Sequence, residues 1–288
     1  MIKQIQILAA FLVFFFVLPI IAGLLPFPNN AKIEYPKVKE PQIVYAAGTV
    51  TTPKTETPPT TTTVSSTPTT TDVSQPLSPF DVLIYFTHSH ETYKPFVESA
   101  TGTIAVYDSI TNLFSMQDMI KNYFQLNGLT TKILDVDVQG VMKQNGLPFH
   151  LAYDTSRKYV AEELQQNTYD LILDIHRDAV GAEATTVSHN NVKYAKIAFV
   201  VGAENPNYKS NLSYANALSD SLNKIIPGIS RGALIKEGKG VDGVYNQDLA
   251  KELLVVEIGG IDNTEDEVYR TISILAQAIS KTFVTKEL

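Results

Sequence analysis

Two histidines and a glutamate lie close together in the sequence YFTHSHETY of residues 85–93: His88, His90 and Glu91. This segment ends a run of apolar residues, and another histidine, His176, ends a second apolar run. Two neutral imidazoles and one carboxylate are a common ligand set of catalytic zinc sites, which keep one position open for water. The residue types therefore indicate a zinc site assembled from two separate segments of the chain.

The third ligand of this candidate site can be chosen in more than one way. Glu91 lies on the same loop as His88 and is our preferred third ligand. His90 is the alternative if the extended backbone persists, because side chains two residues apart then point the same way. Asp118, near the start of a predicted helix, is a more distant alternative. His88 alone would not define a site, since a histidine after a strand is more often an ordinary loop residue.

A further carboxylate, Glu257, lies inside the apolar sequence LLVVEIGG of residues 253–260. Burying a carboxylate in such a strand costs free energy unless it has a partner. A carboxylate that lies close to a zinc ion without binding it can take a proton from water and pass it to a leaving nitrogen. We therefore predict that Glu257 is the catalytic base of a zinc-dependent hydrolase.

Other chemistries find less support in the sequence. The chain has no cysteine for thiol catalysis and no G-x-x-x-x-G-K-[ST] sequence for binding phosphate. It also lacks the compact H-E-x-x-H zinc motif, so the spacing of the candidate ligands is by itself a weak signal. The formal net charge is −7 and no cluster of lysine and arginine stands out, which argues against nucleic acid as a partner.

The strands and helices that must position these residues can be predicted from the pattern of apolar and polar residues. Apolar runs rich in β-branched residues predict buried strands at residues 81–88, 131–137, 170–176, 195–202 and 252–260. Helical periodicity fills the segments between them, and the last helix opens with a capping box formed by Thr264 and Glu267. This alternation predicts an α/β fold with a mainly parallel sheet flanked by helices.

The predicted sheet brings the candidate residues to one edge. Loops that follow the carboxyl ends of parallel strands converge at the same edge, where α/β proteins bind their ligands. His88, His176 and Glu257 each lie at or near the end of a predicted strand. We therefore expect them to share one site.

Two segments with a different composition precede this domain. Residues 7–25 carry no charge, and 19 residues can cross a hydrocarbon core as a helix, which predicts an N-terminal membrane anchor within residues 1–28. Residues 51–79 are almost entirely threonine, serine and proline, which predicts a disordered linker over residues 29–79. The α/β domain then spans residues 80–288, and a stalk of this composition favours an extracytoplasmic location.

Four segments together resemble the stage II sporulation protein P family: YFTHSHETY, LILDIHRDA, YNQDL and LLVVEIGGIDNTEDE, in this order. Members of that family are membrane-anchored peptidoglycan hydrolases of endospore-forming bacteria, akin to zinc-dependent N-acetylmuramoyl-L-alanine amidases. The resemblance implies amidase activity, endopeptidase activity and cooperation with the sporulation proteins D and M during engulfment. It also implies a single-pass protein of the cell membrane whose amidase-like hydrolase domain faces the intermembrane space of the sporulation septum.

The resemblance also implies roles for individual residues. It makes His88 and His176 zinc ligands, with Glu91 as the third ligand and Glu257 as the catalytic carboxylate. It adds Arg177 and Asp178 as residues of the site wall, with Arg177 also in contact with the substrate. It further adds Tyr245, Asn246 and Gln247 as a substrate-facing loop and Asn263 as a structural residue. His90 departs from the family pattern, in which a different polar residue is usual.

Two other classes of protein could have the same fold. A catalytically silent module that binds or scaffolds the cell wall would keep a groove but would not need zinc. A tethered domain that binds a small ligand is the other class, and only its fold speaks for it. Metal content separates the hydrolase from the scaffold.

Overall fold

The structure is a computed structural model that describes residues 79–284. The predicted anchor, residues 1–28, and nearly all of the predicted linker, residues 29–79, lie outside this range. Within residues 79–284, no helix combines the length and the apolar character that crossing a membrane requires. The membrane anchor thus stays a prediction from the sequence.

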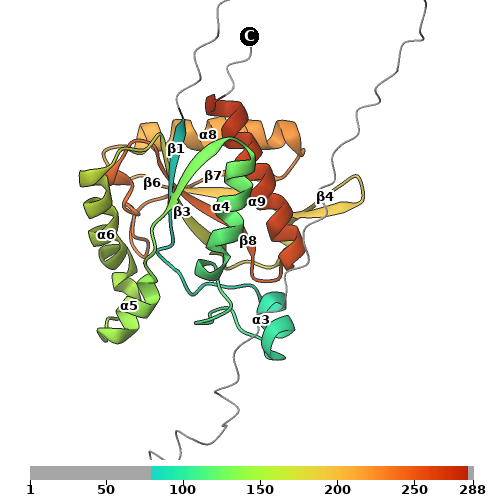
Figure 1. The fold of residues 1–288 in the computed structure, drawn as a ribbon, viewed down its shortest axis with the longest axis horizontal. Coiled ribbons are helices and arrows are strands. Elements are labelled where there is room, and N and C mark those ends of the chain that lie inside the picture. Colours follow the sequence, from blue (N-terminus) through green and yellow to red (C-terminus); the bar gives the residue numbers. More distant parts are fainter. Residues whose placement is uncertain (1–78, 285–288) are drawn as a thin grey trace, which may run out of the picture. The chain divides into compact units, whose positions relative to one another are not determined.

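A six-stranded sheet forms the centre of the described domain, with the strand order β2-β1-β3-β8-β6-β7 (Figure 1). Its first four strands run parallel to one another, whereas β6 pairs with β8 in the antiparallel direction and β7 runs parallel to β6. The mainly parallel α/β sheet is therefore confirmed. The strands are β1 (Phe80–Tyr85), β2 (Leu129–Ile133), β3 (Leu171–Asp178), β6 (Ile197–Gly202), β7 (Ser230–Lys236) and β8 (Leu253–Gly260). A separate hairpin consists of β4 (Thr186–His189) and β5 (Val192–Ala195).

Helices cover both faces of the sheet. The main helices are α3 (Lys94–Thr101), α4 (Gln117–Leu126), α5 (Val138–Gln144), α6 (Ala152–Gln166), α7 (Ala182–Thr185), α8 (Tyr208–Ile225) and α9 (Glu265–Ile279). Single turns of helix occur at η3 (Phe114–Met116), η4 (Phe149–Leu151), η5 (Gln247–Leu249) and η6 (Ser280–Val284). Figure 1 shows α4 and α9 on one side of the sheet and α6 on the other.

The strand residues alternate between two cores of unequal size. Ile84 of β1 and Leu173 of β3 belong to the large core formed with α4, α8 and α9. Leu83 and Ile172, one residue away in each strand, belong to a small core against Val160 of α6. Both faces are buried, which explains why these strands read as continuous apolar runs. The α6 face is the thinner layer, and the candidate site lies on it.

Some boundaries differ from the sequence prediction. The first strand ends at Tyr85, so that His88 lies in a turn beyond the strand and not at its end. The strand β7 and the β4–β5 hairpin were not predicted, because their residues are only partly buried and mix polar with apolar types. The capping box of Thr264 and Glu267 is confirmed.

Asn263 has the structural role that was predicted for it. Its Oδ1 accepts a hydrogen bond from the backbone N–H of Gly260 at 2.8 Å, and its Nδ2 donates to Glu267 Oε2 at 2.9 Å. Gly259 needs the left-handed region, with φ of 66°, and a Cβ there would lie 2.7 Å from Asn263 Oδ1. These contacts fix the turn that follows β8.

Candidate metal and catalytic site

Two histidines and a glutamate converge at one edge of the sheet: His88 and Glu91 lie beyond the end of β1, and His176 lies near the end of β3. His88, Glu91 and His176 each offer one ligand atom, and these atoms all lie within 4.8 Å of one another. His88 Nδ1 lies 3.3 Å from Glu91 Oε1, and His176 Nδ1 lies 3.7 Å from Glu91 Oε2. The sequence-predicted ligand set is therefore brought together in space.

The Glu91 carboxylate lies between the two imidazoles. Burial by itself would raise its pKa, but the contact with His88 and the positive charge of His176 outweigh burial and lower the pKa. The backbone N–H of Arg177 also donates to Glu91 Oε2 at 2.9 Å. Glu91 is thus held as an ionised carboxylate, which is the form that a metal ligand needs.

The loop that carries these ligands is anchored to the start of α5. Ser89 Oγ donates to Asp137 Oδ1 at 2.7 Å, and His90 Nε2 lies 3.0 Å from Asp137 Oδ2. The backbone N–H of His90 donates to Gln139 Oε1 at 2.6 Å. Asp137 also caps α5 by accepting a hydrogen bond from the Gly140 N–H.

These contacts decide between the alternative third ligands. The ring of His90 is directed to Asp137 and is not part of the cluster formed by His88, Glu91 and His176. Asp118 is an exposed residue in the first turn of α4 and is also outside the cluster. The geometry therefore favours Glu91 over both alternatives, because the turn at residues 87–90 ends the alternation that would have aligned His90 with His88.

A buried carboxylate, Asp174, lies behind His176. Its Oδ2 is 3.0 Å from His176 Nε2, on the side of the ring away from Glu91, although not in hydrogen-bond geometry. The backbone N–H of Thr87 donates to Asp174 Oδ1 at 2.9 Å, and the Thr87 hydroxyl donates to Asp174 Oδ2 at 2.7 Å. Burial would lower the pKa of His176, but Asp174 and then Glu91 and Glu257 outweigh it and raise the pKa to about 9.

We expect Asp174→Asn to weaken zinc binding by roughly 10- to 100-fold, because carboxylates behind metal-bound histidines fix the ring and raise its basicity. The asparagine can still accept the hydrogen bond from the Thr87 backbone, so the fold should be retained. A competition titration with a chromophoric chelator measures the affinity. Asp170→Asn, a change before the amino end of the same strand, is the control and should bind zinc as the wild type does. Equal affinities in the two variants would show that Asp174 does not support the site.

Glu257 is the register partner of His176 on the neighbouring strand β8. Its Oε2 is buried and has no hydrogen-bond partner among the described residues. Burial raises the pKa of Glu257 to about 7; the positive charge of His176 opposes this rise, and the nearby Glu91 carboxylate adds to it. A carboxyl group with a pKa close to the working pH is suited to taking up and releasing protons.

This unpartnered carboxylate should also destabilise the metal-free domain. The pKa of Glu257 is 4.5 unperturbed and about 7 in the folded protein. The folded state therefore binds this proton more tightly than the unfolded state, and the free energy of unfolding falls as the pH rises from 4.5 to 7. We expect Glu257→Gln to stabilise the metal-free protein by about 1–2 kcal/mol above pH 7, because the buried charge is removed.

Thermal unfolding with a chelator present, at pH 5 and at pH 8, measures this effect for both proteins. The difference in Tm should be larger at pH 8 than at pH 5. A glutamine variant that is equally or less stable than the wild type at pH 8 would contradict the inference that Glu257 is a buried carboxylate without a partner.

Aromatic rings close the site on the side of α6. The Tyr153 ring stacks on His176, with centroids 6.1 Å apart and planes 12° apart. The Phe149 ring lies against His88 at 4.8 Å. Burial raises the pKa of Tyr153 well above its usual value, so that its hydroxyl stays neutral. These rings restrict the orientations of both imidazoles.

Two predicted wall residues are used inside the protein. The guanidinium of Arg177 is buried and donates to the Val106 carbonyl at 2.8 Å. Asp178 Oδ2 accepts from Arg231 Nη1 at 2.5 Å. Arg177 is thus 3% exposed and already bonded to the backbone, which does not favour a substrate contact, and that contact stays a prediction.

The predicted substrate-facing loop divides in the same way. Gln247 is fully buried, accepts from the Gly202 N–H at 2.8 Å and donates to the Val200 carbonyl at 2.9 Å. Asn246 is also buried and donates to Ser156 Oγ at 3.0 Å. Both side chains therefore hold the loop in place. Because their polar atoms are already bonded within the protein, these bonds do not favour a substrate contact. The Tyr245 ring is partly exposed and lies edge-on to Tyr153 at 5.3 Å, so its substrate contact stays a prediction.

One sequence pattern of a serine hydrolase also occurs, G-x-S-x-G at residues 228–232. In a serine hydrolase this pattern forms a turn from a strand into a helix that exposes the serine. Here it follows α8 and leads into β7, and the Ser230 hydroxyl lies 2.8 Å from the Ser219 hydroxyl. Among the described residues no histidine bonds Ser230, so the residues here do not form the nucleophile geometry of a serine hydrolase.

The site contains functional side chains that our sequence reasoning missed, namely Asp174, Tyr153 and Phe149. Asp174 had a usable signal, because it is a lone carboxylate in the apolar strand two residues before His176 and therefore on the same face. The two aromatic residues had no such signal. They come from the start of α6 and from η4, and only the tertiary packing brings them to the histidines.

The donor set fits zinc better than calcium or magnesium. Two imidazoles and one carboxylate are the zinc ligands of several hydrolases, whereas calcium and magnesium prefer more oxygen ligands. The unpartnered Oε2 of Glu257 beside the cluster is a further polar atom that lacks its partner. Among the described residues, His88, Glu91 and His176 are thus the group suited to hold the metal.

Fold and site together define an α/β protein with a two-histidine, one-carboxylate site at the carboxyl edge of its parallel strands. The chain belongs to the stage II sporulation protein P family, whose sequence profile matches residues 30–280. It is 34% identical over 203 residues to the stage II sporulation protein P of Bacillus subtilis strain 168. The match covers 70% of this chain and 51% of that protein, so the chain spans about half the length of its relative.

Solved structures show more distant similarities. The CwlD amidase of Clostridioides difficile, determined in complex with the GerS lipoprotein, is 13% identical with a TM-score of 0.42, covering 70% of this chain and 96% of that one. The N-acetylmuramyl-L-alanine amidase Ami1 of Mycobacterium smegmatis is 14% identical with a TM-score of 0.42, covering 72% and 97%. Similarity of this degree does not establish a shared activity.

Proposed function

We propose that this protein is a zinc-dependent peptidoglycan hydrolase that cleaves amide bonds of the cell wall during sporulation. The observation that carries the proposal is the convergence of His88, Glu91 and His176 beside a carboxylate whose Oε2 has no partner, Glu257. Membership of the stage II sporulation protein P family supports the biological setting. The amide bond between muramic acid and L-alanine is the proposed target, with a peptide bond of the stem as the second.

The proposed mechanism assigns a task to each group. His88, Glu91 and His176 would hold a zinc ion, which would act as a Lewis acid that polarises a carbonyl group and makes water more acidic. Glu257 takes the proton of the attacking water and then gives it to the leaving nitrogen, for which a pKa of about 7 is well suited. Asp174, together with the ring of Tyr153, holds His176 in its orientation.

The location of the protein forms a further part of the proposal. The uncharged sequence at residues 7–25 would anchor the chain in the cell membrane with a single span. The threonine- and proline-rich linker would then place the domain outside the cytoplasm, within reach of the wall. The sporulation proteins D and M are the proposed partners at the septum.

The experiment that tests the function uses purified, zinc-loaded protein and isolated sacculi. Mass spectrometry of the soluble products should reveal free stem peptides with a new N-terminal alanine amine, which are absent from sacculi incubated without the protein. Chelation should stop the release, and zinc should restore it. A folded, zinc-loaded protein that binds sacculi and releases no peptide or muropeptide would contradict the proposal and favour a wall-binding scaffold.

A further inference from the structure

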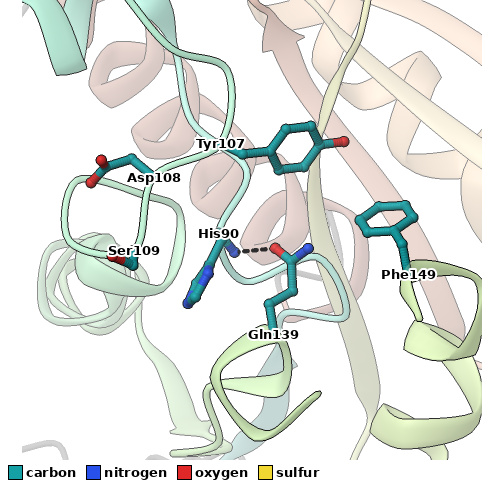
Figure 2. Close-up of a pocket in the computed structure, with 6 residues that line it drawn as sticks. All are labelled: His90, Tyr107, Asp108, Ser109, Gln139 and Phe149. Carbon is teal, nitrogen blue, oxygen red and sulfur yellow. Dashed lines mark hydrogen bonds between the residues drawn. The ribbon is translucent and has the colours of Figure 1, made fainter. Parts of the chain in front are cut away.

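An open pocket of about 340 Å³ lies next to the metal site (Figure 2). Its lining consists of His90, Tyr107, Asp108, Ser109, Gln139 and Phe149. None of these residues belongs to the cluster of His88, Glu91 and His176 or to the proposed proton transfer. The pocket is large enough to hold one building block of a polymeric ligand, since the volumes of ligand pockets begin at about 300 Å³.

The pocket is joined to the metal site through its own walls. The Phe149 ring lies 4.8 Å from the ring of His88. Tyr107 forms an isolated backbone bridge with Glu91, so that a metal ligand and this wall share one stretch of paired backbone. A group bound in the pocket would therefore lie beside the bond that the metal site acts on.

Two aromatic rings form the apolar part of the pocket. Tyr107 and Phe149 are 47% and 50% exposed, which is high for aromatic side chains, and their centroids are 5.9 Å apart in an edge-to-face arrangement. Figure 2 shows both rings at the pocket, with the Tyr107 ring directed toward Phe149. Exposed rings of this kind offer flat apolar surface with little loss of side-chain entropy on binding.

The polar part of the pocket is rich in neutral groups and carries no fixed positive charge. Ser109 and the amide Nε2 of Gln139 are available, because Gln139 uses its Oε1 to accept from the His90 backbone. Asp108 Oδ1 accepts from the N–H groups of Ile110 and Thr111, which leaves Oδ2 without a partner among the described residues.

No lysine or arginine lines the pocket. The nearest arginine in contact with the lining, Arg177, is buried behind the Tyr107 ring and bonded to the Val106 carbonyl. The Asp108 carboxylate disfavours an anionic ligand. His90, which also lines the pocket, is already paired with the Asp137 carboxylate at 3.0 Å and is therefore not a free partner for an anion. The chemistry therefore favours a neutral ligand with one apolar face and several hydroxyl or amide groups.

We propose that this pocket binds an N-acetylated sugar of the glycan strand, next to the bond that is cleaved. Tyr107 and Phe149 contact the apolar face of the sugar and its acetamido methyl group, and Asp108, Ser109 and Gln139 bond its polar groups. Stem peptides fit less well, because they carry free carboxylates. This inference rests on the proposed function, since it presumes a peptidoglycan substrate.

The test is the binding of an N-acetylglucosamine tetramer, which has no stem peptide and no scissile peptide bond. Isothermal titration of the full chain in detergent, zinc-loaded and again after chelation, separates sugar binding from hydrolysis. We expect binding in both states, weakened about tenfold or more by Tyr107→Ala and by Phe149→Ala. The control is Leu126→Ala, because Leu126 is 72% exposed on α4, outside the pocket. Thermal unfolding and zinc affinity establish that each variant is folded.

The outcomes distinguish the pocket from the proposed function. Absence of tetramer binding, or equal binding by wild type and both pocket variants, overturns the sugar subsite even if sacculi are cleaved. Binding of a stem peptide that both pocket variants abolish, without any binding of the tetramer, also overturns it. Tetramer binding that depends on Tyr107 and Phe149 supports the subsite even if the protein cleaves no sacculi, and only the hydrolase proposal then fails.

Discussion

Glu257→Gln is expected to lower the turnover of cell-wall substrate by about 10²- to 10⁴-fold, the usual contribution of a general acid–base group. Glutamine keeps the size of the side chain but cannot take up the proton of the attacking water. Because Glu257 is not one of the clustered ligands, zinc affinity should remain close to that of the wild type. Release of stem peptides under single-turnover conditions measures the effect.

A second variant on the same strand serves as the control for this assignment. Glu252→Gln changes a carboxylate just before the amino end of the same strand, β8, and should leave turnover unchanged. Addition of zinc should not rescue Glu257→Gln, since the loss is not one of metal. Near-normal turnover by a folded, zinc-loaded Glu257→Gln protein would remove Glu257 from the mechanism.

Glu91→Gln should weaken zinc binding by more than about 100-fold and reduce turnover in proportion to the lost metal, because it removes the only carboxylate of the cluster. The substitution keeps the shape of the side chain, and its amide oxygen can still accept the hydrogen bond from the Arg177 backbone. The loop should therefore fold as before. Competition against a chelator measures zinc affinity, and excess zinc should restore part of the activity.

Glu98→Gln on the exposed face of α3 is the matched control for this second prediction. It should change neither zinc affinity nor turnover. If Glu91→Gln bound zinc as tightly as the wild type, the third ligand would have to be another group. His90→Ala and Glu257→Gln would then identify which one.

The sheet and the meeting of His176 with Glu257 could be predicted from the sequence, because both residues interrupt apolar runs that form neighbouring parallel strands. Successive side chains of a strand point to opposite faces of the sheet, and the carboxyl ends of parallel strands share one edge. Both rules can be applied without knowledge of the tertiary structure. The first rule would also have identified Asp174, two residues before His176, had it been applied there. What was predictable thus depended on regular backbone.

The loops could not be predicted in the same way. His90 is as close to His88 in sequence as a ligand would be, and only the turn and the Asp137 partner on α5 direct it elsewhere. Asn246 and Gln247 read as polar loop residues, yet their amides bond groups on α6 and β6. Such bonds join segments distant in sequence, and no local pattern encodes them.

Asn246 illustrates the physical reason most clearly. Tyr245 and Asn246 both adopt the left-handed region, with φ of 54° and 58°, which asparagine tolerates but which is costly for a bulky residue such as tyrosine. The bidentate pair of Arg157 with Asp248, at 2.7 and 2.6 Å, holds the loop against α6. This tertiary contact stabilises a backbone that the local sequence alone would disfavour.

The central claim is that the loop of residues 88–91 forms half of a zinc site, and metal content tests it most directly. Zinc per chain should be measured in purified, zinc-loaded wild-type protein together with His88→Ala and His90→Ala. We predict about one zinc in the wild type and in His90→Ala, and none in His88→Ala. A well-folded wild-type protein that retains no zinc, or a loss of zinc in His90→Ala but not in His88→Ala, would contradict the account.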